Sequence, residues 1–372
     1  MMKFAKQDSI ILQIFLFIIA CTSIYGIREY LGGTLSGRLI WFSALFAIYF
    51  YSQKYKSPAI FKLYVLSIIT GFFLHNVANV SIEESFNNTI LIRIIPVMLL
   101  VAAQQQTIQP RPFILFVFMF FFAECSIALY EKFTLTHLID YKSTEDNMAT
   151  SVVMLESSTF RSFSLMFHPL YNANVISIIL AFILCADFIK PIYKYPLIAM
   201  GLASLWAFNS RGAMIVWGII LVYRVMLYKA KIWYVIIMVG VLYFLLPPLI
   251  EWIGYSGLLG RLTEFDFSDS STLTRFEAFD IFFNERWSFE DIIVGGQMLC
   301  YPGTNVLLEN GVLLDLGYWG ILIGTIKVVC EILITYNTLI NYNLRDKILI
   351  MLAIWGVAFM NNNSFQTWLM VM

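Results

Sequence analysis

Four arginines and one histidine in this sequence stand beside apolar stretches, where a charged side chain is costly and usually serves a purpose. A guanidinium group suits phosphate oxygens, because its planar fork of N–H donors can bind two oxygens at once. An imidazole can exchange a proton near neutral pH. Together such groups could bind a phosphate-bearing substrate and assist a proton transfer. The five residues are Arg161, His168, Arg211, Arg275 and Arg286.

Arg275 and Arg286 lie in the longest polar stretch between apolar segments, residues 254–305. Thr274-Arg275-Phe276-Glu277 has the Thr-x-x-Glu form of a capping box, which predicts a helix start. Apolar residues then follow at steps of three and four and form one face: Phe276, Phe279, Phe283 and Trp287. We expect an amphipathic helix over about residues 274–287, lying on a membrane with both arginines beside its apolar face. A lid whose arginines contact only lipid phosphates is the alternative.

Arg161 and His168 precede an apolar segment that begins Pro169-Leu170-Tyr171-Asn172. Proline suits the first turn of a helix, so His168 is predicted to lie at a helix start, which attracts anions. Asn172 falls within the first turns. A solvated histidine at an interface is the alternative interpretation.

Arg211 stands in the short connection 208–213 between two apolar segments. So tight a turn is predicted to need glycine, and it leaves Arg211 at the rim of a membrane. An arginine that merely extends toward the interface is the alternative.

The composition indicates an integral membrane protein: the chain is 60% hydrophobic and 13% charged, far from soluble domains. About twenty apolar residues span a bilayer as a helix, and the chain contains about eleven such segments. We therefore expect an all-α, polytopic fold, with residues 1–372 as a single transmembrane domain. The expected spans are roughly 10–26, 38–52, 61–80, 90–104, 112–130, 168–188, 195–209, 212–228, 232–252, 316–336 and 347–360.

Basic residues alternate between the connections in a way that predicts the orientation, because cytoplasmic loops are rich in lysine and arginine. With a cytoplasmic amino terminus, the connections on that side carry Lys54, Lys56, Lys62, Arg111, Lys190, Lys194, Arg224, Lys229, Lys231, Arg345 and Lys347. The opposite connections are acidic, and residues 254–305 fall on that outer side. The four arginines named above break this charge rule, which favours a role in binding an anion.

Ionisable residues inside the expected spans are further candidates. Arg93 and Glu124 could pair across two helices or bind substrate, and Lys327 and Glu331 have the i,i+4 spacing of a pair on one helix face. Glu309, near the outer rim, could act as a base if an apolar setting raised its pKa. The five cysteines show no disulfide framework and no Cys/His metal spacing, so we expect no metal and no cofactor.

The order of these motifs resembles the O-antigen polymerase and O-antigen ligase family of bacterial polysaccharide membrane glycosyltransferases. The resemblance covers about residues 155–325 and rests on order and sidedness. Its motifs are Arg161 with His168-Pro169-Leu170-Tyr171-Asn172, Ser210-Arg211-Gly212-Ala213, Arg275, Gly295-Gly296, Thr304-Asn305 and Leu316-Gly317-Tyr318-Trp319-Gly320. Thr304 stands where the family has a histidine, which favours a polymerase over a ligase.

The resemblance implies a GT-C-like fold with a large periplasmic loop and a metal-independent glycosyltransferase in the bacterial inner membrane. The implied substrate is an oligosaccharide repeat linked to undecaprenyl pyrophosphate, polymerised on the periplasmic face. The expected catalytic residues are Arg211, Arg275, His168 and Glu309, and the expected substrate-binding residues are Arg161, Arg286, Asn172 and Asn305.

The expected partners are the lipid-linked oligosaccharide, membrane lipids and a chain-length regulator, and no nucleic acid. A ligase that transfers glycan to the lipid A core is one alternative. A flippase or transporter of lipid-linked glycan is the other, and it would need charged groups at the membrane midplane.

Overall fold

The computed structural model describes residues 58–77, 94, 97, 110–138, 160–166, 169–227, 270–285, 287–295 and 310–359. Within these ranges the regular structure is helical, without strands, as expected for the all-α class. The chain divides into two compact units, one of Met1–Phe120 with Arg275–Met372 and one of Phe121–Thr274. The expectation of a single transmembrane domain over 1–372, with a loop at 254–305, stays a prediction.

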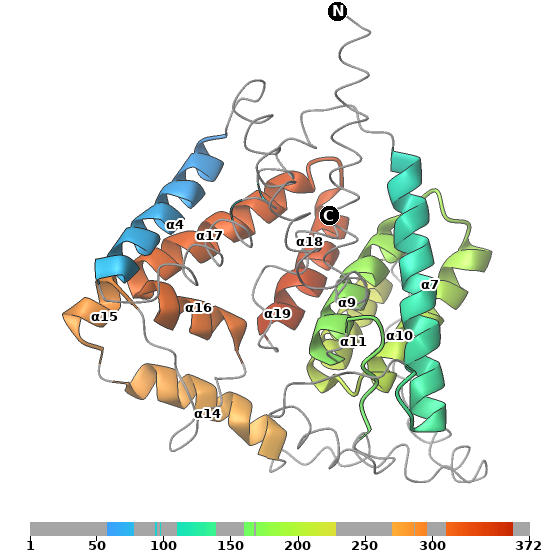
Figure 1. Ribbon diagram of the computed structural model, residues 1–372. Coiled ribbons are helices and arrows are strands. Elements are labelled where there is room, and N and C mark those ends of the chain that lie inside the picture. Colours follow the sequence, from blue (N-terminus) through green and yellow to red (C-terminus); the bar gives the residue numbers. More distant parts are fainter. Residues whose placement is uncertain are drawn as a thin grey trace, which may run out of the picture. The chain divides into compact units, whose positions relative to one another are not determined.

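The first unit is arranged around α17, which contacts α4, α15, α16 and α18. Figure 1 shows α4 running alongside α17. The helices are α4 (Ala59–Val77), α14 (Ser270–Asn284, in this unit from Arg275), α15 (Phe289–Ile293), α16 (Gly311–Trp319), α17 (Ile321–Thr338), α18 (Leu344–Met351) and α19 (Val357–Phe359). A π-helical stretch, η3 (Leu352–Gly356), joins the last two.

Gly320 separates α16 from α17, and its φ of 79° is a left-handed value that an α-helix does not accommodate. The expected span 316–336 is therefore wrong at its start, since the helix that follows this break begins at Ile321. Asn310 caps α16, because its Oδ1 accepts the N–H groups of Val312 and Leu313, each over 3.1 Å.

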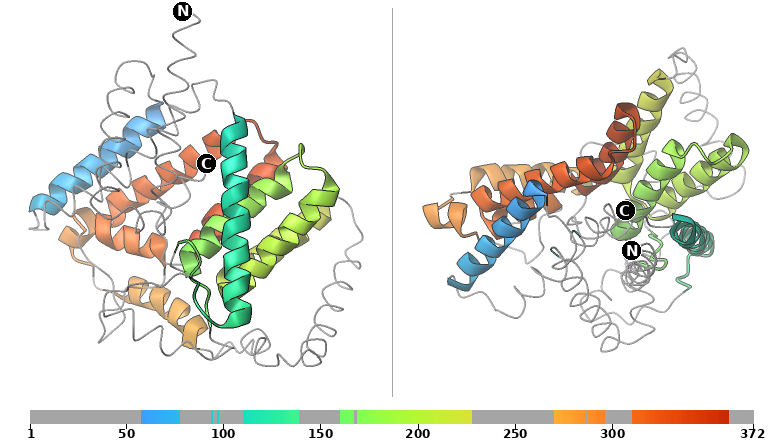
Figure 2. Two further views of the ribbon diagram at one scale, coloured as in Figure 1. Left: turned by 45° about the vertical axis from the view of Figure 1, so that its right-hand side comes forward. Right: turned by 90° about the horizontal axis from the view of Figure 1, so that it is seen from above.

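The second unit contains α7 (Pro110–Thr134) from Phe121 onward, α9 (Pro169–Cys185), α10 (Pro191–Ala207) and α11 (Arg211–Leu227). In Figure 2, α9, α10 and α11 lie beside one another, and their mutual contacts agree. α9 is buried on nearly every side. Gly201 of α10 lets the two helices approach, because a Cβ atom there would overlap the side chain of Leu180 on α9. This packing makes α9 the centre of the unit.

Two of the described helices are long and apolar enough to cross a membrane, Ile114–Thr134 and Ile321–Thr338. Ala59–Leu74 and Pro169–Cys185 are shorter apolar helices. The expected spans 10–26, 38–52 and 232–252 lie outside the described residues, and of 90–104 only Ile94 and Val97 are described. Membrane association is thus indicated by these two helices, and the eleven-span topology stays a prediction.

Candidate functional site

Arg161 and Arg211 are brought to one junction of the second unit. The N–H of Ser162 donates to the carbonyl oxygen of Ala207 over 3.2 Å, and the Ser162 hydroxyl donates to the carbonyl oxygen of Ala128 over 2.7 Å. The segment 160–166 is therefore fixed to the end of α10 and to α7. Both arginines are half-buried, so each guanidinium is partly shielded from water at this junction.

The turn before Arg211 follows from hydrogen bonds of the Schellman type. The N–H of Ser210 donates to the carbonyl of Leu205 over 3.3 Å, and that of Asn209 to the carbonyl of Trp206 over 2.8 Å. The left-handed residue is Asn209, with φ of 53°. The expectation that glycine makes this turn is wrong, because asparagine tolerates this conformation. Arg211, expected within the connection 208–213, is the first residue of α11.

The carboxylate of Glu131 holds the segment 160–166 by its backbone. One oxygen, Oε2, accepts the N–H groups of Phe163 and Ser164 over 2.8 and 3.1 Å, and Oε1 accepts that of Leu138 over 3.0 Å. Ser164 has a φ of 43°, a left-handed value for a residue with a side chain. The hydrogen bonds to the Glu131 carboxylate offset the energetic cost of this backbone conformation. Glu131 lies on α7, although the sequence placed it in the following loop.

Glu124, two turns before Glu131 on the same face of α7, makes a second attachment. Its Oε2 accepts the N–H of Leu165 over 3.1 Å, and its own carbonyl oxygen accepts the hydroxyl of Ser164 over 3.0 Å. Arg93, the partner considered for Glu124, lies outside the described residues. The N–H groups of residues 163–165 are thus occupied by carboxylates. These N–H groups are therefore not available to an anion.

Lys132 and His137 are two residues of this junction that the sequence reasoning missed. Lys132 is buried; its Nζ donates to the carbonyl of Phe160 over 2.8 Å and lies 5.4 Å from the ring centroid of Trp206. The imidazole of His137 stacks against the rings of Phe160 and Phe163 at centroid distances of 4.9 and 4.3 Å. The sequence around His137 does not indicate this arrangement, because the arrangement depends on contacts with a segment more than twenty residues away.

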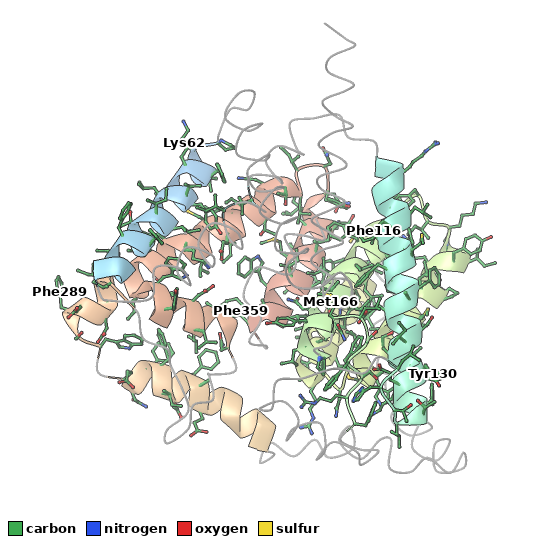
Figure 3. The ribbon with its side chains drawn as sticks, viewed as in Figure 1. Lys62, Phe116, Tyr130, Met166, Phe289 and Phe359 are labelled. Carbon is green, nitrogen blue, oxygen red and sulfur yellow. The ribbon has the colours of Figure 1, made fainter. Side chains whose placement is uncertain are left out.

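Asn172 joins the start of α9 to the same segment, because its Nδ2 donates to the carbonyl of Phe163 over 2.6 Å. Figure 3 labels Met166, the last residue of this segment, and Tyr130 of α7. Asn172 is fully buried, and its Oδ1 makes no hydrogen bond within the described part of the chain. Of the predicted site residues, Arg161, Arg211 and Asn172 are thus brought together.

The helix α14 begins at Ser270, four residues before the predicted capping box, so Thr274 and Glu277 lie within the helix. The side chain of Arg275 is not described. This predicted site residue is placed by its backbone alone, in the second turn of the helix.

The residues of α14 that are buried in the first unit do not belong to the apolar face predicted from the sequence. Ala278 and Phe282 are buried against Leu313, with Ile321 of α17 beside them. Phe279 and Phe283 are exposed by 41% and 74%. Trp287 lies beyond the helix end and folds back, so that its Nε1–H donates to the carbonyl of Phe282 over 3.0 Å. One face of α14 is thus fixed to the first unit and the neighbouring phenylalanine face stays open, as does Phe289 of α15 (Figure 3).

Gly295 and Gly320, from two separate sequence motifs, meet in the first unit. Gly295 has a φ of 71°, and a Cβ atom built on it would overlap the backbone nitrogen of Gly320. A Cβ on Gly320 would lie 2.9 Å from the carbonyl oxygens of Ile292 and Ile293. The two backbones therefore approach closely at these glycines.

Lys327 forms a buried ionic cluster inside α17. Its Nζ lies 2.9 Å from Oε1 of Glu331, the predicted i,i+4 partner, and 2.7 Å from Oδ2 of Asp315 on α16. The hydroxyl of Tyr64 on α4 donates to the same Glu331 oxygen over 3.3 Å. The cluster ties three helices together by charge-assisted bonds.

The remaining predicted site residues lie outside the described residues: His168, Arg286, Asn305 and Glu309. In the described part of the chain, no three His, Cys, Asp or Glu side chains come together as a metal site would require. The chain matches no family model, no curated protein and no solved structure in the three comparisons made. The family resemblance therefore stays a prediction from the sequence.

Proposed function

We propose that this chain is a polytopic glycosyltransferase of the bacterial inner membrane. It polymerises oligosaccharide repeats that are linked to undecaprenyl pyrophosphate, on the periplasmic face. The observation that carries this proposal is the junction at which Arg161 and Arg211 belong to two segments joined by the Ser162–Ala207 hydrogen bond. Two guanidinium groups at one junction suit the several oxygens of a pyrophosphate.

The glycosyl transfer needs few catalytic groups, because the lipid pyrophosphate is already a good leaving group. Catalysis then depends on stabilising its charge and orienting the acceptor hydroxyl. Arg161 and Arg211 stabilise the charge in this proposal, and Arg275 and Arg286 stay cationic candidates from the sequence. Asn172 binds sugar or phosphate oxygens, with Asn305 as a second candidate from the sequence. The sequence also offers His168 and Glu309 as candidates to take the proton of the hydroxyl, and both lie outside the described residues. No metal or cofactor is required by this scheme.

The direction of the helices in the second unit supports the proposed orientation. α9 ends at Cys185 and α10 begins at Pro191, so Lys190 and Lys194 lie at the end of this helix group away from Arg211. Arg224, in the last turn of α11, lies at that same far end. Basic residues at that end favour a cytoplasmic location for it. The junction of Arg161 and Arg211 then faces the periplasm, with a cytoplasmic amino terminus.

A transporter of lipid-linked glycan is the second candidate, because one observation favours it. Lys327, Asp315 and Glu331 form a buried charged cluster, and two of them lie on α17, a helix apolar enough to cross a membrane. Charged groups at such a depth are common in transport pathways. The short distances within the cluster also fit a purely structural role, in which the lysine neutralises its partners and fixes α16 to α17.

The proposed function is tested in cells that lack the chromosomal copy of this chain, supplied with wild type, Arg161→Ala or Arg211→Ala. We expect the variants to reach the membrane in normal amount and to leave single repeats on the lipid A core. A ligase would instead leave no repeats there, and a flippase would leave lipid-linked repeats on the cytoplasmic side. Normal chain lengths in both variants would refute the assignment of these arginines.

A further inference from the structure

His137 is held in a defined position by three neighbours. Its ring lies at 8° to that of Phe163 and at 22° to that of Phe160, and stacking of this kind fixes the ring plane. Nδ1 lies 3.7 Å from Oε2 of Glu131, whose side chain is 1% exposed, while that of His137 is 27% exposed. An imidazole with a fixed plane and a carboxylate on one side is oriented for proton transfer.

The buried edge of the ring is the one that carries Nδ1, which makes no hydrogen bond among the described residues. The exposed part of the side chain therefore belongs to its other atoms. Nδ1 is the ring nitrogen on the side of the Glu131 carboxylate, so Nε2 is the nitrogen left to receive a proton from a substrate.

Among the described residues, Glu131 of α7 faces the imidazole, Lys132 of α7 contacts the Phe160 ring that stacks on it, and Arg161 follows Phe160 in the sequence. The Lys132 ammonium is engaged with the carbonyl of Phe160 and the rings of Phe160 and Trp206. Arg161 stands between the two phenylalanines that hold His137. His137 thus stacks on the segment that carries one proposed pyrophosphate ligand.

We propose that His137 accepts the proton of the acceptor sugar hydroxyl in the glycosyl transfer. This inference rests on the proposed function. The hydroxyl oxygen forms a bond to the anomeric carbon of the donor glycan, and the bond from that carbon to the pyrophosphate oxygen breaks. The electron pair leaves with the lipid pyrophosphate, and the hydroxyl proton moves to Nε2 of His137. His137 later returns this proton to water.

Two variants separate a proton acceptor from a stacking residue. His137→Phe keeps an aromatic ring between the same neighbours and removes both nitrogens. His137→Ala leaves space into which added imidazole can diffuse. Both are compared with wild type in vesicles that contain purified lipid-linked repeats, with the rate of chain elongation followed from pH 5 to 9.

We expect His137→Phe to lower the turnover number by about 100-fold or more, in the range of general base catalysis, with little change in KM. Wild-type activity should rise with pH on an acid limb that this variant lacks, and imidazole should restore part of the His137→Ala rate. Either near wild-type turnover of His137→Phe or a His137→Ala variant that imidazole does not restore would overturn the proposal. If wild type elongates no repeats, the proposed function itself fails, which is a different result.

Discussion

The backbone N–H of Ser162 donates to the carbonyl oxygen of Ala207 over 3.2 Å. These two residues lie forty-five positions apart in the sequence, and their bond joins the segment that carries Arg161 to the turn that precedes Arg211. Because both segments are also fixed to neighbouring helices, the two arginines occupy set positions. The proposed pyrophosphate site depends on this junction.

Replacing either arginine should weaken binding of the lipid pyrophosphate. A charge-assisted hydrogen bond contributes about 1.5–3 kcal/mol, so Arg161→Ala and Arg211→Ala should each reduce kcat/KM by about 10- to 100-fold. The Arg211→Lys variant should recover only part, since lysine lacks the planar fork. Elongation rates at several substrate concentrations give these values.

Arg224→Ala is the matched control, since Arg224 lies in the last turn of the same helix that begins with Arg211. We expect its kcat/KM to equal that of wild type. An equal loss of kcat/KM in Arg211→Ala and Arg224→Ala would show that the loss follows from removing any arginine of this helix and not from Arg211 in particular.

Removing the carboxylate of Glu131 should release the segment 160–166. Glu131→Ala leaves the N–H groups of Phe163, Ser164 and Leu138 without their acceptor, at a cost of about 1–3 kcal/mol for each buried donor. Amide hydrogen exchange should therefore speed up at Phe163 and Ser164 by at least about tenfold. Glu277→Ala, which removes an exposed carboxylate on α14, should change neither rate. Unchanged protection at Phe163 and Ser164 would contradict the hydrogen bonds to Glu131.

Several features of this junction followed from the sequence. Pro169 begins its helix as predicted, because local rules place proline in a first turn. Arg211 was expected in the connection 208–213, and the structure makes it the first residue of α11. The left-handed residue was assigned wrongly to a glycine. Asn209 takes that role, and nothing local distinguishes the two candidates.

Glu131, Lys132 and His137 could not be found from the sequence. Their roles come from bonds to residues 160–164, which follow a stretch of more than twenty residues. The pair of Lys327 and Glu331 was found, since i,i+4 spacing is local, while Asp315 and Tyr64 were missed as members of that cluster. Local patterns predicted the helices and one ion pair, and tertiary contacts decided the rest.

Lys327 should be essential for stability rather than for catalysis. Lys327→Met leaves two buried carboxylates without their cation, and breaking such a pair costs about 3–5 kcal/mol. The melting temperature in detergent should fall accordingly. Adding Asp315→Asn and Glu331→Gln to this variant should restore much of the lost melting temperature, because no unpaired buried charge then remains in the cluster. A Lys327→Met variant with the same melting temperature as the wild type would show that the cluster is not ionic.

Gly320 should not tolerate a side chain. Its φ of 79° and its contact with the carbonyls of Ile292 and Ile293 leave no room for Cβ, and a left-handed conformation alone costs about 1–3 kcal/mol for a non-glycine residue. Gly320→Ala should lower the melting temperature. Gly218→Ala is the control, since Gly218 lies within α11 with open space around it and alanine favours a helix by about 1 kcal/mol. Equal melting of both variants would contradict the close approach of α15 to the α16–α17 break.

The central claim is tested most directly by reconstituting the purified chain in lipid vesicles with its proposed substrate alone. The substrate is an oligosaccharide repeat linked to undecaprenyl pyrophosphate, and products are resolved by length on a gel. The account predicts chains of several repeats, formed without added metal and lost in an Arg161→Ala/Arg211→Ala double variant. Repeats that stay single with the wild-type chain, or chains that the double variant lengthens equally well, would contradict it.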